Sequence, residues 1–140
     1  MKNKLIITHM RAAFLYANLS HCERRKVGCV IVKNDSIIAI GYNGTPSGDD
    51  NCCELDSGST KPTVIHAEDN ALRKLTKGSE SAKDAIAFVT TAPCSLCAPR
   101  LVDAGVKAVY YVDLYRCEEG IKYLESKGVT TTQLDADLFN

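Results

Sequence analysis

The spacing of apolar residues changes along the chain, and these changes separate helices from strands. Between residues 5 and 19 apolar side chains recur every three or four positions, which predicts an amphipathic helix. Two β-branched runs, at 27–33 and 37–42, flank turn residues at 34–36 and predict an antiparallel hairpin. Both runs are almost continuously apolar, so we expect the sheet to be covered on both faces.

The second half of the chain alternates strand and helix patterns. Strands are predicted at 85–90, 108–112 and 129–134, and helices at 68–75, 93–104 and 117–126. A helix separates the last two strands, so this crossover predicts that they run parallel. The fold class is therefore α/β, a three-layer α/β/α arrangement with a mixed five-stranded sheet. We expect the whole chain, 1–140, to form a single domain.

Residues 43–63 interrupt this alternation with a long segment rich in Gly, Pro, Ser, Asp and Asn. Loops of this length inside a small domain usually carry function. The segment leads directly to His66, so we expect it to border the functional site.

Residue types that bind metal gather in two motifs, His66-x-Glu68 and Pro93-Cys94-x-x-Cys97. We expect Cys94 and Cys97 to lie in the first turn of one helix, with both thiols on the same side. One His and two Cys give Zn²⁺ three protein ligands and leave a fourth position for water, as in catalytic zinc sites. Glu68 is close enough to act as a base toward that water. These residues predict a hydrolytic zinc enzyme.

Composition limits the partners. Seventeen basic and seventeen acidic residues give a formal net charge of zero, which argues against a nucleic-acid-binding face. No apolar run approaches membrane-spanning length, and no export signal is evident, so we expect no membrane partner. The chain has seven cysteines, an odd number. We therefore expect a reduced protein without disulfides, in the cytoplasm or, for a viral protein, the host cytoplasm.

With three further stretches, at 24–28, 41–48 and 115–116, the two motifs resemble the bacterial and phage deoxycytidylate (dCMP) deaminases of the cytidine deaminase-like superfamily. The resemblance runs from about residue 22 to residue 129. It implies the cytidine deaminase-like fold and hydrolysis of dCMP to dUMP and ammonia, which supplies dUMP for dTTP synthesis. It also implies that Glu68 passes a proton from water to N3 and later to the leaving amine.

The resemblance implies a set of substrate contacts as well. Arg24 and Arg116 would bind the 5′-phosphate, Asn43 would hold the sugar, and Ala67 and Tyr115 would border the substrate. Each residue also has a plainer interpretation: the arginines as solvated surface charges, Asn43 as a turn residue, and Tyr115 as filler at a strand end.

Related enzymes are commonly hexamers that dCTP activates and dTTP inhibits, with the triphosphate bound near the glycine-rich loop. The resemblance therefore implies a homo-oligomer and, with Mg²⁺, a regulatory nucleotide site at Gly41, Tyr42, Asn43, Gly44 and Gly48. Alternatively, residues 41–48 form a turn-rich loop that only packs beside the active site.

Other functions stay open at this stage. One alternative is another deaminase of the superfamily, acting on a nucleoside, a free base or a tRNA adenosine. A second is a non-catalytic zinc or thiol-redox module, although a structural zinc site has no need of the base Glu68. A further set of residues either forms a second zinc site or consists of buried and free side chains: Cys52, Cys53, Cys22, His9 and His21.

Overall fold

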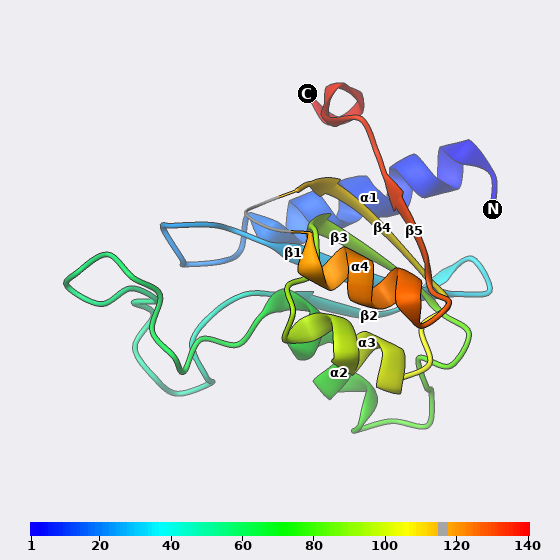
Figure 1. Cartoon of the computed structure of the whole chain (residues 1–140). Helices are drawn as coiled ribbons and strands as arrows, with labels where there is room; N and C mark the ends of the chain where they lie inside the picture. Colours follow the sequence, from blue (N-terminus) through cyan, green and yellow to red (C-terminus); the bar gives the residue numbers. More distant parts are fainter. Residues whose placement is uncertain (115–117) are drawn as a thin grey trace.

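A computed structural model describes residues 1–114 and 118–140 of the chain (Figure 1). Its helices and strands follow one another in the predicted order. In sequence they are α1 (Asn3–Ala17), β1 (Gly28–Lys33), β2 (Ser36–Tyr42), α2 (Ala67–Leu75), β3 (Ile86–Thr91), α3 (Cys97–Asp103), β4 (Ala108–Asp113), α4 (Glu119–Ser126), β5 (Thr130–Gln133) and a short 3₁₀ helix (Ala136–Phe139). The final 3₁₀ helix was not predicted.

The five strands form one mixed sheet in the order β2-β1-β3-β4-β5. Strand β1 is antiparallel to both β2 and β3, whereas β3, β4 and β5 run parallel. The predicted parallel pairing of the last two strands is thus confirmed. In the hairpin turn, Asn34 and Asp35 have φ values of 52° and 63°, the left-handed conformation that tight hairpins require.

Helices cover both faces of the sheet, which confirms the three-layer α/β/α prediction. Helix α1 packs on one face, where Met10 and Ala13 meet Val30 and Phe88. Helices α2, α3 and α4 lie on the opposite face (Figure 1). Within the described residues no helix is long and apolar enough to cross a membrane.

Strand β2 is less covered than its apolar sequence predicts. Strand β1 is buried from Gly28 to Val32, but β2 begins exposed, and 41% of Ile37 is accessible to solvent. The prediction of cover on both faces therefore holds for β1 and is wrong for the start of β2. The reason is position, because β2 is the edge strand of the sheet.

The expectation of a protein without disulfides is also wrong. Cys22 and Cys53 form a disulfide, although 31 positions separate them in sequence. Both are buried, and the pairing joins the segment after α1 to the long loop before α2. Cysteine spacing alone does not determine pairing, so the sequence could not reveal it. A second zinc site was one alternative for Cys22, Cys52, Cys53, His9 and His21. Among the described residues these five do not gather at one site, since Cys22 pairs with Cys53 and His9 packs against the ring of Phe88 in the core.

Candidate metal centre

His66 is the residue immediately before α2, where its extended backbone (ψ 155°) turns the chain into the helix. The long loop is fixed at this point by a pair of backbone hydrogen bonds between Gly44 and Ile65, with N–O distances of 3.1 and 2.8 Å. The loop therefore delivers His66 to the site from a defined backbone position, as its place in the sequence predicts.

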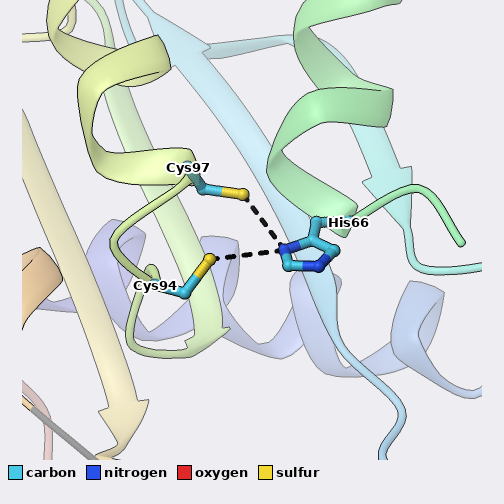
Figure 2. A group of neighbouring side chains, drawn as sticks. All are labelled: His66, Cys94 and Cys97. Atoms are coloured by element: carbon cyan, nitrogen blue, oxygen red, sulfur yellow. Dashed lines mark hydrogen bonds between the residues drawn. The ribbon is translucent and has the colours of Figure 1, made fainter. Parts of the chain in front are cut away.

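The two cysteines approach from the carboxyl end of β3. Cys97 is the first residue of α3, but Cys94 lies in the turn before it. The prediction that both occupy the first helical turn is therefore wrong for Cys94. Its carbonyl accepts the N–H of Ala98 at 3.0 Å, so Cys94 supplies the acceptor that starts the helix while lying outside it. Figure 2 shows both sulfur atoms directed at the His66 ring.

The three side chains match the dimensions of a zinc site. His66 Nδ1 lies 3.4 Å from Cys94 Sγ and 3.2 Å from Cys97 Sγ (Figure 2). Tetrahedral Zn²⁺ bonded to sulfur at about 2.3 Å and nitrogen at about 2.0 Å separates these atoms by roughly 3.5 Å. All three ligand atoms lie within 4.8 Å of one another. His66, Cys94 and Cys97 therefore fit Zn²⁺.

Hydrogen bonding among these groups favours the thiolate that zinc requires. A hydrogen bond from Cys97 lowers the pKa of the Cys94 thiol to about 3, and His66 assists. The same hydrogen bond, together with burial, raises the pKa of Cys97. The hydrogen bond with Cys94 also raises the pKa of His66. The lowered pKa of Cys94 favours its thiolate form, in which a cysteine binds a metal ion.

Glu68 lies in the first turn of α2, beside the three ligands. Only 4% of the residue is exposed, and burial raises the pKa of its carboxyl group to about 7. A carboxyl group with that pKa can both accept and return a proton at neutral pH, as a general acid–base requires. Burial and the raised pKa support the role of Glu68 as the base, which stays a prediction.

A cavity of about 310 Å³ opens beside these residues, and His66, Glu68 and Cys94 are in its wall. The rest of its lining comes from separate segments: Cys22, Arg24, Arg25, Val27, Asn43, Glu54, Thr60, Val64, Ala67, Thr91 and Ala92. Three residues predicted to contact substrate, Arg24, Asn43 and Ala67, are in this group. The other two, Tyr115 and Arg116, lie outside the described residues.

Comparison with known proteins decides the family. The sequence model for the zinc-binding region of cytidine and deoxycytidylate deaminases matches residues 4–113. The chain belongs to this family. The matched region contains the candidate ligands His66, Cys94 and Cys97 and the candidate base Glu68.

Several relatives in the family are deoxycytidylate deaminases. The Saccharomyces cerevisiae enzyme is 37% identical over 134 residues, covering 89% of this chain and 43% of the yeast protein. The enzyme of phage T4 is 30% identical over 149 residues, covering 77% of each chain. The chain spans less than half the length of the two yeast relatives it matches, 43% in S. cerevisiae and 42% in Schizosaccharomyces pombe.

A solved structure covers nearly the whole chain. The dCMP deaminase of cyanophage S-TIM5, crystallised in complex with dCMP and dUMP, is 47% identical and superimposes with a TM-score of 0.94. The match covers 96% of this chain and 99% of the cyanophage chain. The predicted resemblance and the predicted fold are both confirmed.

In the wall of the pocket, Asn43 links two segments of the backbone. Its Nδ2 donates to the carbonyl of Arg25 at 2.8 Å, and its Oδ1 accepts the N–H of Val27 at 2.9 Å. Asn43 therefore does more than form a turn. The amide retains a second N–H and a second oxygen lone pair for a ligand, so the predicted sugar contact stays a prediction.

The glycine-rich loop combines packing positions with open ones. A Cβ on Gly41 would overlap the carbonyl of Ala67, so this glycine allows β2 to approach α2 closely. The N–H groups of Asn43 and Gly44 donate to Val27 and Ile65 and are already engaged. The loop's next glycine, Gly48, has a φ of +92° and open space around it.

The Tyr42 ring faces the ammonium of Lys74 on α2, 6.0 Å from Nζ to the ring centroid. Tyr42 thus lies against the helix that His66 precedes. The predicted nucleotide site at Gly41, Tyr42, Asn43, Gly44 and Gly48 stays a prediction.

Asp69 joins the two helices of the metal centre, a contact that the sequence did not reveal. One of its carboxylate oxygens lies 3.1 Å from Arg73 on α2 and 3.3 Å from Arg100 on α3. Both arginine side chains are more than half exposed, so each pair contributes little to stability. The contact nevertheless links the helix that follows His66 to the helix that begins at Cys97.

Gly120 on α4 packs directly against the backbone of a metal ligand. A Cβ there would overlap the carbonyl oxygen of Pro93 and lie 2.9 Å from that of Cys94. We expect Gly120→Ala to displace Cys94, to weaken zinc binding and to destabilise the fold by about 1–3 kcal/mol. Thermal unfolding and competition with a zinc chelator measure both effects. Gly78→Ala is the control because Gly78 has open space; equal behaviour of the two variants would contradict the packing account.

Proposed function

We propose that this chain hydrolyses dCMP to dUMP and ammonia. The observation that carries the proposal is a buried proton-transfer carboxyl, Glu68, beside a zinc-type ligand set in a chain 47% identical to a dCMP deaminase. The relatives in yeast and phage T4 bear the same activity in their names, which supports dCMP as substrate over a free base or a tRNA.

The residues of the pocket divide the chemistry between them. His66, Cys94 and Cys97 would hold Zn²⁺, which when bound supplies Lewis-acid activation of water at neutral pH. Glu68 accepts a proton from water and donates it to N3 of the pyrimidine; it then accepts the second proton, from the hydroxyl now on C4, and passes it to the departing amine. Oxygen from water replaces the amino nitrogen on C4, and ammonia leaves. The pKa of about 7 suits Glu68 to both directions of transfer.

We further propose that Arg24 and Arg116 bind the 5′-phosphate. The support is the place of Arg24 in the pocket lining, together with the fork geometry by which guanidinium groups pair with phosphates. We expect Arg24→Ala to raise the KM for dCMP by roughly ten- to a hundredfold and to leave deoxycytidine almost unaffected. Steady-state kinetics on both substrates test this, with the exposed Arg11→Ala as control. An equal loss on both substrates would make Arg24 a structural residue.

Regulation by dCTP and dTTP in a homohexamer completes the proposal. The loop at 41–48 supports it, since Asn43 lines the pocket and Gly44 is bonded to the residue before His66. Coupling of about 1–3 kcal/mol would change the apparent affinity for dCMP several-fold. We expect dCTP to lower and dTTP to raise the dCMP concentration at half-saturation, each added with Mg²⁺. A saturation curve that neither nucleotide shifts would leave the loop a role in substrate binding alone.

A further inference from the structure

Residues 20–27 lie in the connection between α1 and β1 and belong to no helix or strand. Arg24 and Arg25 of this segment line the pocket. Regular hydrogen bonding therefore does not fix its backbone. Its position depends on contacts with the long loop, beginning with the Asn43 amide, which holds Arg25 and Val27.

Glu54 of the long loop makes the corresponding contact farther along the segment. Its carboxylate accepts the backbone N–H of Glu23 at 3.2 Å and the backbone N–H of Arg24 at 3.3 Å. Glu54 is itself fixed by a backbone bridge to Thr60 across the loop. The charged group therefore binds the backbone of the residue whose side chain is proposed to meet the phosphate.

The Cys22–Cys53 disulfide lies next to this contact in both segments. Cys22 precedes Glu23, and Cys53 precedes Glu54. Both cysteines are almost completely buried, with exposures of 2% and 0%. A covalent link and a charge-assisted pair of hydrogen bonds thus join the same short stretches of chain.

Glu54 places a negative charge in the wall of the pocket. A carboxylate in the wall of a pocket that takes a phosphorylated substrate repels that substrate. The hydrogen bonds that Glu54 accepts from two backbone N–H groups offset this repulsion by holding the segment in place.

We propose that Glu54 and the Cys22–Cys53 disulfide form a clamp that positions Arg24 for the anionic end of the substrate. Glu54 is thus a positioning residue that acts through the backbone of the 22–25 segment. The inference rests on the proposed function, because it takes a nucleotide phosphate as the group that Arg24 meets.

The clamp predicts the sign of a kinetic change. In Glu54→Gln a neutral amide oxygen holds the two N–H groups less strongly than the carboxylate does, so the segment samples other positions more often. The apparent affinity then falls in proportion to the fraction of molecules that keep the binding arrangement. We expect KM for dCMP to rise about tenfold, with kcat and the kinetics of deoxycytidine changed less than about twofold. Mere repulsion by Glu54 predicts the opposite, a lower KM for dCMP. The matched control is Glu23→Gln, which removes an exposed carboxylate from the same segment and keeps its backbone N–H.

The disulfide half of the clamp has its own variants. Cys53→Ser is expected to raise KM for dCMP in the same way. Cys52→Ser is expected not to, because it leaves the disulfide intact and its hydroxyl can replace the Cys52 thiol as donor to the Glu54 carbonyl, now at 3.3 Å. We expect thiol titration of the denatured wild type to count two more thiols after treatment with a dithiol than before it. The dithiol reduces the Cys22–Cys53 disulfide and is itself oxidised. If reduction releases no thiols and the protein holds two zinc ions per chain, Cys22 and Cys53 bind a metal instead. That result would overturn the disulfide part of the clamp.

Hydrogen exchange of the backbone amides supplies a test that does not depend on activity. We expect the Glu23 and Arg24 amides to be protected in the wild type and to exchange at least tenfold faster in Glu54→Gln but not in Glu23→Gln. Wild-type protein that does not deaminate dCMP would refute the proposed function, while the exchange result would still judge the clamp's structure. Wild-type protein that prefers dCMP, with KM unchanged or lowered in Glu54→Gln, would overturn the clamp alone.

Discussion

Glu68→Gln is expected to retain zinc and fold while losing dCMP turnover by a hundred- to ten-thousand-fold, the usual contribution of general acid–base catalysis. Glutamine has nearly the same shape as glutamate, so it fits the buried position in the first turn of α2. Its amide cannot accept and return a proton. The variant therefore separates proton transfer from metal binding and packing.

The measurement is ammonia release at saturating dCMP, together with the zinc content of the same preparation. Glu125→Gln, an exposed carboxylate on α4, controls for the loss of one negative charge. Turnover above about a tenth of the wild-type rate would show that Glu68 does not carry the protons. Full turnover loss accompanied by zinc loss would assign Glu68 to metal binding instead.

Cys94→Ala is expected to reduce bound zinc from one ion per chain to a small fraction of that and to abolish turnover. Zinc in a site of this type needs three protein ligands, and Cys94 is one of the three side chains that fit it, with a pKa shifted toward the thiolate. Binding free energies for structural zinc reach about 10–16 kcal/mol, and loss of a thiolate ligand removes a large share of such an energy.

Metal analysis after exhaustive dialysis measures this effect, with turnover as the second readout. Cys52→Ala is the matched control because Cys52 is an exposed free thiol away from the metal ligands. Cys94→Ala protein with full zinc and full activity would remove Cys94 from the metal centre.

The parts of the molecule that follow local rules could be predicted from sequence. The spacing of Cys94 and Cys97 predicts that both thiols face the same way, and His66-x-Glu68 places the candidate ligand and base at the start of one helix. The helix between the last two strands required a crossover, which fixed their parallel pairing. These inferences need only neighbours in sequence and the geometry of regular elements.

The missed features depend on segments that meet only in the folded chain. Nothing in the spacing of Cys22 and Cys53 marks them as partners, and no motif marks Glu54 as the acceptor for two backbone N–H groups. Nothing in the sequence around Gly120 indicates its close contact with the backbone of Pro93, because α4 and Pro93 meet only in the folded chain. The start of α3 was misplaced because Cys94 belongs to the turn, although its carbonyl opens the helix.

Ammonia release from a substrate panel tests the central claim most directly. The panel holds dCMP, CMP, deoxycytidine, cytosine and an adenosine in a tRNA stem-loop, each assayed with zinc-loaded wild-type protein. The account predicts the highest kcat/KM for dCMP, and deoxycytidine at least about tenfold lower because it lacks the phosphate that Arg24 and Arg116 are proposed to bind. A preference for cytosine, deoxycytidine or the tRNA adenosine would contradict it.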